Sequence, residues 1–199
     1  MQQATRRLDE LFAAGCLDRR VESLPEQIDS LTDGGHDLSI LSDKEFDTFR
    51  SLTPLFKQMC HELAAYSIPH TLVHGDLHSG NVSRKDDKFV YFDWTDACVS
   101  HPFFDLSILI DYEAPQRDGP LAGHHLLSTY FSVWTEYEPI ERLWQAWELA
   151  RPLAALHQAV SYRYILMGQD KTSTVDIISG YPMWIRRALR ALPDLTMSY

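Results

Sequence analysis

The first apolar residues of the chain recur at helical spacing. We expect one helix over residues 4–14, ended by Gly15, and a second over about 23–31. The apolar stripes of these two helices are Leu8, Leu11 and Phe12, and then Leu24, Ile28 and Leu31. Because each stripe occupies a single face, both segments are predicted to be amphipathic helices that bury one side.

A longer helical region is expected to begin at residue 42. Ser42-Asp43-Lys44-Glu45 has the form of a capping box, in which the serine and glutamate side chains satisfy free N–H groups at a helix start. Apolar residues then recur up to Tyr66 at helical spacing: Phe46, Phe49, Leu52, Leu55, Phe56, Met59 and Leu63. Pro54 is expected to kink this helix or to start a new one capped by Thr53, because proline lacks an N–H.

Short strand-like runs follow this helical region. Residues 71–73 form an apolar run typical of a strand, and residues 82–84 and 89–92 flank a turn-like Lys-Asp-Asp-Lys segment at 85–88. The two flanking runs predict a β hairpin. The rest of the chain has helical patterns over 105–111, 120–136, 140–167 and 184–192. Pro152 is expected to interrupt the third of these helices. The pattern therefore predicts a mainly α (α+β) protein with a small β hairpin.

Composition limits the class of protein and its partners. The chain has 199 residues and is 45% hydrophobic, which suits one domain, or one lobe of a larger protein, with a sizeable core. The formal net charge of −10 argues against nucleic acid as a partner and is compatible with a cationic substrate. Three scattered cysteines are typical of a reduced, cytoplasmic protein. We expect no membrane segment, because no apolar run is long enough.

Candidate chemistry is concentrated between the expected strand and the expected hairpin. His74-Gly75-Asp76-Leu77-His78-Ser79-Gly80-Asn81 precedes the hairpin, and Tyr91-Phe92-Asp93-Trp94 ends it. A hairpin would fold Asp93 back toward the loop that carries Asp76 and Asn81. Two carboxylates and an amide would then converge on one point, as phosphoryl transfer with Mg²⁺ requires.

Three motifs resemble those of the aminoglycoside phosphotransferase and choline kinase superfamily, whose C-terminal lobe is related to that of protein kinases. They are HGDLHSGN at 74–81, FDW at 92–94 and HPFFDL at 101–106, in the family's order and at compatible spacings. One departure is Ser79, where many relatives carry proline. The resemblance covers the middle third of the chain closely and the remainder by helical pattern.

The resemblance implies a role for each motif residue. Asp76 would be the catalytic base that orients the acceptor hydroxyl. Asn81 and Asp93 would bind the nucleotide through Mg²⁺ or Mn²⁺ on the phosphates of ATP. Asp105 would brace the catalytic loop, and His74 would pack within it. The expected activity is ATP-dependent transfer of the γ-phosphate to a hydroxyl of a small polar molecule, for which an amine-bearing acceptor is compatible.

The same resemblance implies that residues 1–199 form a single helical C-terminal lobe, with the catalytic loop and metal hairpin at 71–106. Complete enzymes of the superfamily place a β-rich N-terminal lobe ahead of this region. That lobe supplies a glycine-rich loop and a lysine for the phosphates. We find no such motif in the sequence, so the lobe either lies outside this chain or is lacking in nature. The sequence does not decide which molecule accepts the phosphate, whether ATP or GTP donates it, or how many copies of the chain associate.

Other interpretations of the same residues remain. Asp76 and Asn81 also suit loop caps. His74, Asp76 and His78 spell HxDxH, which resembles the ligand set of a metal-dependent hydrolase. A non-catalytic, kinase-like binding module would keep the cleft without the turnover. Four acidic residues are candidates either for a substrate cleft or for a solvated face: Asp111, Glu113, Glu136 and Glu138.

Overall fold

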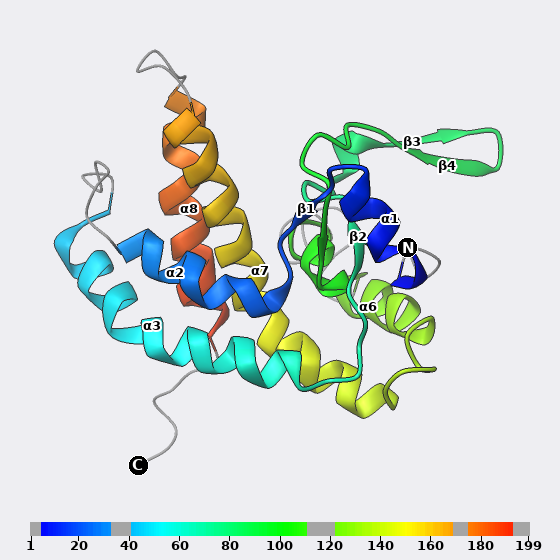
Figure 1. Ribbon diagram of the computed structural model, residues 1–199, viewed down its shortest axis with the longest axis horizontal. Coiled ribbons are helices and arrows are strands. Elements are labelled where there is room, and N and C mark those ends of the chain that lie inside the picture. The colour runs from blue at the N-terminus through cyan, green and yellow to red at the C-terminus, as the bar shows by residue number, and fades with distance from the viewer. Residues whose placement is uncertain (1–4, 33–40, 111–121, 169–174, 193–199) are drawn as a thin grey trace. The chain divides into compact units, whose positions relative to one another are not determined.

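The structure is a computed structural model that describes residues 5–32, 41–110, 122–168 and 175–192 (Figure 1). The chain divides into two compact units. The first consists of Met1–Arg20 and Tyr66–Trp147, and the second of Val21–Ala65 and Glu148–Tyr199. Each unit is described separately below.

The first unit is built on a small mixed sheet with the strand order β1-β5-β2. Strand β5 (Cys98–Ser100) lies in the centre, parallel to β1 (Leu17–Asp18) and antiparallel to β2 (Thr71–Val73). All three residues of β5 are buried, as expected for a central strand with both faces covered. The predicted strand at 71–73 is confirmed, whereas β1 and β5 were not expected.

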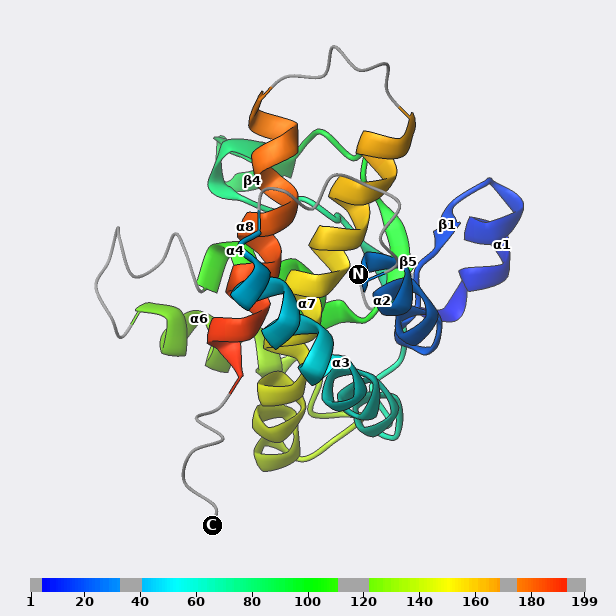
Figure 2. The same cartoon turned by 90° about the vertical axis from the view of Figure 1, so that its left-hand side faces the viewer.

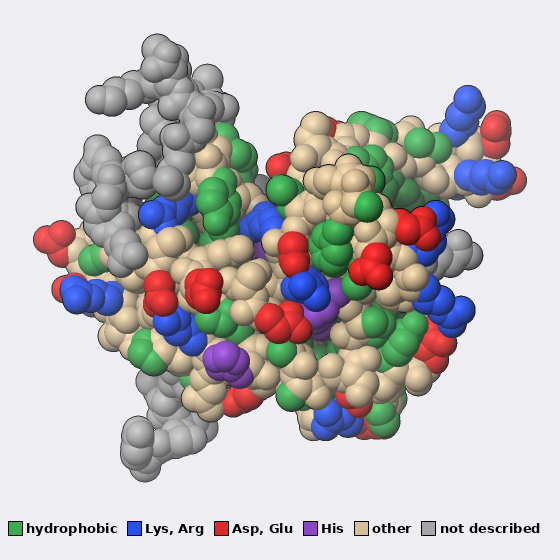
Figure 3. All heavy atoms as spheres, in the orientation of Figure 1, with side chains coloured by type: hydrophobic (Ala, Val, Ile, Leu, Met, Phe, Trp, Pro, Cys, Tyr) green, Lys and Arg blue, Asp and Glu red, His purple; other side chains and the backbone are tan. Residues whose placement is uncertain are grey.

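The predicted hairpin is also present. Strands β3 (Val82–Lys85) and β4 (Lys88–Tyr91) pair antiparallel, with Val82 opposite Tyr91 and Lys85 opposite Lys88. The tight turn between them places Asp86 at φ +53°, a left-handed conformation that Asp tolerates better than most residues. In the space-filling view the hairpin carries charged side chains at its tip and hydrophobic ones toward its base (Figure 3).

Short helices and loops surround these strands in the first unit. They are α1 (Leu8–Ala13), η4 (Ser79–Asn81), η5 (Pro102–Asp105), α4 (Leu106–Ile108), α6 (Ala122–Ser132) and the start of α7 (Ile140–Gly168). An aromatic core joins them, because the fully buried Phe103 packs against Phe131 with ring centroids 4.9 Å apart and against Trp147 at 6.4 Å. This core fixes η5, which carries Asp105.

The second unit is helical. It contains η2 (Val21–Ser23), α2 (Leu24–Thr32), α3 (Asp43–Ala64), the remainder of α7 and α8 (Val175–Ala191), and α7 and α8 run side by side in opposite directions (Figure 2). The predicted stripe of α2 is confirmed, since Leu24, Ile28 and Leu31 are all buried. The Tyr181 hydroxyl donates to the carbonyl of Leu31 at 2.9 Å and ties α8 to α2.

The capping box of α3 is confirmed, but the expectation for Pro54 is partly wrong. Ser42 Oγ accepts from the Glu45 N–H, and the Glu45 carboxylate accepts from the Ser42 N–H. Helix α3 continues through Pro54, and Thr53 does not cap a new helix, because its hydroxyl donates to the Phe49 carbonyl one turn earlier. Helix α7 likewise continues through Pro152. A proline removes one backbone hydrogen bond, and the buried residues around it keep the helix intact.

Candidate active site

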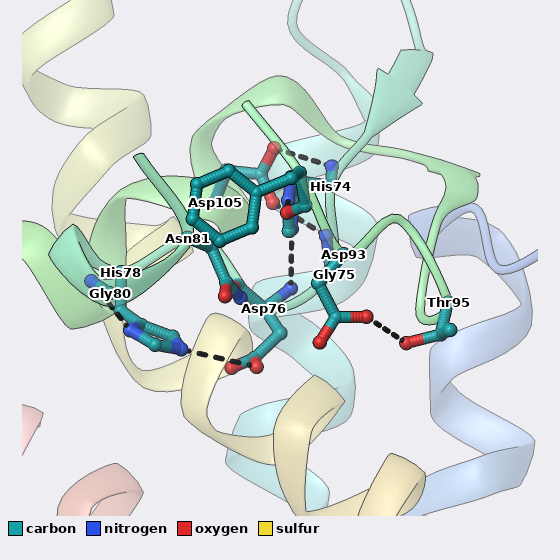
Figure 4. A network of polar contacts seen from close by, with 10 residues as sticks. His74, Gly75, Asp76, His78, Gly80, Asn81, Asp93, Thr95 and Asp105 are labelled. Atoms are coloured by element: carbon teal, nitrogen blue, oxygen red, sulfur yellow. Dashed lines mark hydrogen bonds and ion pairs between the residues drawn. The ribbon is translucent and has the colours of Figure 1, made fainter. Parts of the chain in front are cut away.

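The loop after β2 is anchored by one buried carboxylate. Asp105, only 4% exposed, accepts the His74 N–H at 2.7 Å through Oδ2 and the Gly75 N–H at 2.9 Å through Oδ1 (Figure 4). Burial raises the pKa of Asp105 to about 6, while these two N–H groups act in the opposite direction. Asp105 is therefore ionised at neutral pH, with an oxygen for each amide.

His74 connects the loop to the end of the hairpin. Its Nε2 lies 3.0 Å from the carbonyl of Phe92, which can only accept, so Nε2 carries the proton. Its Nδ1 then accepts the Asp76 N–H at 3.4 Å, and its ring packs on Trp94 with centroids 4.7 Å apart. Both ring nitrogens thus have backbone partners. This arrangement disfavours the zinc-ligand interpretation of HxDxH.

Gly75 allows the loop to touch the segment after the hairpin. Its φ is +84°, and a Cβ at this position would lie 2.2 Å from the backbone oxygen of Asp96. No side chain fits such a gap, and the left-handed conformation also favours glycine. The close approach brings the Asp93–Asp96 segment against the loop that carries Asp76.

Asn81 links the two halves of the site. It is buried, and its Nδ2 donates to the carbonyl of Asp76 at 3.1 Å. Its backbone carbonyl accepts the N–H of Phe92, the residue before Asp93, at 3.1 Å. With Nδ2 engaged, Oδ1 is the oxygen that Asn81 offers to a ligand.

Asp93 adopts a left-handed conformation with φ +62° and is exposed. Its Oδ1 accepts the Thr95 hydroxyl at 2.7 Å. In the close-up the carboxylates of Asp76 and Asp93 and the amide of Asn81 are directed to the same side (Figure 4). The three residues that the sequence placed together therefore lie on one side of the loop, which His74 and Asp105 anchor.

One acidic residue near the site was missed by the sequence reasoning. Partial burial raises the pKa of Asp96, and the negative charges of Asp76 and Asp93 raise it further, against the opposing charge of Arg19. Asp96 lies three positions after Asp93 in the sequence, which gave no reason to place it near Asp76. That proximity depends on the contact made by Gly75.

Two of the four acidic candidates outside the motifs, Glu136 and Glu138, lie in the described part of the chain. Glu138 is 7% exposed and accepts hydrogen bonds from the Ser67 N–H at 2.8 Å and the Arg142 guanidinium at 2.6 Å, so it serves as an internal link. Glu136 is exposed, whereas Asp111 and Glu113 lie outside the described residues.

Among the residues that the structure describes, no group of three or more His, Cys, Asp or Glu side chains is placed to hold a metal ion. No helix within the described ranges is long and apolar enough to cross a membrane.

The chain is similar to known phosphotransfer enzymes. The family model described as "Phosphotransferase enzyme family" matches residues 3–140. No curated protein gave a significant match. Among solved structures, the chain is similar to a Plasmodium vivax ethanolamine kinase, with a TM-score of 0.54 and 16% identity over 82% of this chain and 49% of that one. It also matches a spectinomycin phosphotransferase in complex with ADP and spectinomycin, with a TM-score of 0.37 and 13% identity over 85% of this chain and 55% of that one.

The chain thus spans about half the length of the two solved structures. The likeness to the ethanolamine kinase indicates a kinase-like fold, and the mostly helical structure with a few strands fits it. Together with the family match over more than half of the sequence, the three motifs lead to one identification. The chain belongs to the phosphotransferase enzyme family, within the aminoglycoside phosphotransferase and choline kinase-like superfamily.

Proposed function

We propose that this chain carries the catalytic and metal-binding residues of an ATP-dependent phosphotransferase. The enzyme would transfer the γ-phosphate to a hydroxyl of a small polar molecule. The observation that carries the proposal is a pair of hydrogen bonds made by Asn81, on a loop braced by Asp105. The Asn81 side-chain amide donates to the Asp76 carbonyl, and the Asn81 backbone carbonyl accepts from Phe92, the neighbour of Asp93. Positioned carboxylate and amide oxygens of this kind are what phosphoryl transfer needs, since its catalysis is mostly positioning and electrostatics.

Asp76 is the proposed catalytic base. Its backbone is held on both sides, because its N–H donates to His74 and its carbonyl accepts from Asn81. Its side chain is 42% exposed, so an acceptor hydroxyl can reach it. A carboxylate at this place accepts or steers the hydroxyl proton as the oxygen attacks the phosphoryl group.

Asn81 and Asp93 are the proposed ligands for Mg²⁺ or Mn²⁺. Hard divalent cations prefer oxygen ligands, and the amide oxygen of Asn81 and the exposed carboxylate of Asp93 provide them. When bound, the ion would neutralise charge on the nucleotide phosphates. The donor set of amide and carboxylate therefore fits the metal that the family implies.

The acceptor is proposed to bear an amine as well as a hydroxyl. The net charge of −10 would attract a cation, and the solved structure with the higher TM-score is named an ethanolamine kinase. Small amino alcohols and aminated sugars are accordingly the first acceptors to test.

The catalytic assignment is tested by Asp76→Asn in the full-length form of the protein. Turnover of labelled ATP with a panel of amino alcohols and aminated sugars should fall by at least ~10²-fold, the low end for loss of a general base. Nucleotide affinity, measured by calorimetry with Mg·ATP, should change little, because this residue acts on the acceptor. Near-normal turnover by the variant would show that the role given to Asp76 is wrong.

The metal assignment has a separate test. Asp93→Asn should abolish Mn²⁺ binding in the presence of nucleotide, detected by paramagnetic broadening of nearby resonances, and should leave the fold intact. Asp87→Asn, at the exposed hairpin turn, is the matched control and should bind Mn²⁺ normally. A tight Zn²⁺ site that depends on His74 and His78 and ignores nucleotide would favour the hydrolase interpretation instead.

A further inference from the structure

The ring of His78 is oriented by the loop that follows it. The Gly80 N–H donates to His78 Nδ1 at 3.0 Å, so in the neutral ring the proton resides on Nε2. Nε2 lies on the opposite edge of the imidazole from Nδ1, the atom that makes the backbone contact. The loop thus selects one tautomer and turns its N–H outward, away from η4.

Gly80 is what lets the ring lie there. A Cβ on Gly80 would sit 2.6 Å from Cε1 of His78 and 2.8 Å from its Nδ1. Any larger residue would therefore push the imidazole away from this position. The position is also fixed along the backbone, because the Asn81 N–H donates to the His78 carbonyl at 3.0 Å.

The outward N–H of His78 faces the carboxylate of Asp76. Nε2 lies 3.5 Å from Asp76 Oδ2, at the outer limit of a hydrogen bond and within reach of a small side-chain adjustment (Figure 4). The backbone of Asp76 is fixed by His74 and Asn81, but those bonds leave its side chain free to rotate. Within the described part of the chain, the carboxylate is contacted by His78.

From this geometry we propose that His78 is a positioning residue for Asp76. Its Nε2–H holds Oδ2 and thereby leaves Oδ1 to receive the acceptor hydroxyl. The catalytic part of this inference rests on the proposed function of Asp76, whereas the His78–Asp76 contact does not. A donor that fixes one oxygen of a base lowers the number of unproductive rotamers without changing the chemistry.

The contact is tested directly by NMR of the 199-residue chain labelled with ¹⁵N-histidine. Long-range correlation spectra at neutral pH should show His78 protonated at Nε2 and unprotonated at Nδ1. Asp76→Asn should shift the Nε2 resonance, and the control Asp87→Asn should leave it unchanged. Gly80→Ala should remove the single-tautomer signature. A His78 protonated at Nδ1, or a resonance insensitive to Asp76, would overturn the proposal.

The positioning role is tested by two variants in the full-length protein, with Mg·ATP and the acceptor that supports wild-type turnover. His78→Phe keeps a ring without a donor, and its kcat should fall about 10-fold, with KM for Mg·ATP within about 2-fold of wild type. His78→Gln places an amide N–H near the former Nε2 and should recover kcat to within about 3-fold. Thermal melting checks that both variants fold.

Equal kcat for His78→Phe and wild type would overturn the positioning role, and so would equal losses in the Phe and Gln variants. Failure of the proposed function is distinguishable. It would appear as no phosphate transfer by wild type, which removes the catalytic part, while the NMR spectra would still decide whether His78 donates to Asp76.

Discussion

At the residue scale, the site depends on two glycines whose lack of a side chain allows close contacts. Gly75 and Gly80 each leave a gap that another part of the molecule fills, namely the Asp96 backbone and the His78 ring. Asp93 also accepts a left-handed backbone, with φ +62°, at the point where the chain turns back toward the loop. Such conformations persist where the surroundings determine them, and here the preceding residue, Phe92, is held by hydrogen bonds to His74 and to the Asn81 carbonyl.

Gly75→Ala separates close contact from backbone strain. Gly15 has a similar φ of +88° but nothing within 4 Å of its would-be Cβ, so Gly15→Ala is a matched control. The control should lower the free energy of unfolding by about 1 kcal/mol, the cost of a left-handed alanine. Gly75→Ala adds a clash with the Asp96 carbonyl and should cost about 3 kcal/mol or more. Urea denaturation measures both, and equal losses would show that the loop relaxes easily.

At the element scale, the sequence predicted the elements that depend on residues close together in the chain. The capping box of α3 and the β3–β4 hairpin were both predictable, because each depends on residues a few positions apart. Strands β1 and β5 were not, since each is two or three residues long and pairs with a partner about 80 residues away. Pro54 and Pro152 misled for the opposite reason, because buried neighbours outweighed a local preference.

The site itself followed the same division. Asp76, Asn81 and Asp93 were predicted together from motif order and a hairpin. The placement of Asp96 and the orientation of His78 were not predictable, because both depend on where two glycines allow close approach.

Element η5 provides a prediction about pH. Its cap, His101, is 2% exposed and accepts the Phe103 N–H at 3.3 Å, and burial lowers the pKa of His101 to about 3. Between pH 6.5 and 3, His101 is therefore protonated in the unfolded chain and neutral in the folded chain. The free energy of unfolding consequently falls as pH falls through this range. Unfolding free energy should drop by about 2–3 kcal/mol from pH 6.5 to about 4 on account of this residue.

His101→Asn is the variant that tests this expectation, since asparagine can still cap η5 but does not titrate. Its stability should lose this acid dependence. Asp105 acts in the other direction, because its raised pKa makes the folded state bind the extra proton between about 4 and 6, so it favours folding as pH falls. The contribution of Asp105 to the variant's stability should consequently rise on acidification over that range, whereas Glu45, whose pKa is lowered to about 2 by Arg186, acts in the opposite direction as pH falls below about 4.5. Unfolding free energies from urea denaturation at several pH values measure this. The same pH dependence in His101→Asn and in wild type would contradict the burial of a neutral His101.

At the scale of the whole molecule, the main fact is length. The match to the ethanolamine kinase covers 82% of this chain but only 49% of the kinase. No glycine-rich phosphate loop is recognisable in the sequence of this chain. Whatever holds the nucleotide from the other side in a complete enzyme is therefore proposed to come from another segment. The residues described here would grip the nucleotide through the metal alone.

The isolated 199-residue chain is accordingly expected to fold but to transfer phosphate poorly. Losing half of the contacts that position the nucleotide should reduce kcat/KM by at least about 10²-fold relative to the full-length protein. Turnover assays with Mg·ATP measure this, with circular dichroism to confirm folding. Efficient turnover by residues 1–199 alone would contradict the expectation. Submicromolar binding of an amine-bearing ligand without turnover, in both forms of the protein, would support a binding module.

The contact between His74 and Trp94 also gives the protein a built-in optical reporter. Trp94 is 43% exposed, donates its indole N–H to the Tyr91 carbonyl and packs against His74 in the loop after β2. Indole emission responds to the polarity and motion around the ring, whereas Trp134, Trp147 and Trp184 are buried and contribute a steady background. Movement of the loop on binding a ligand would therefore be visible as a change in intrinsic fluorescence, without any added dye.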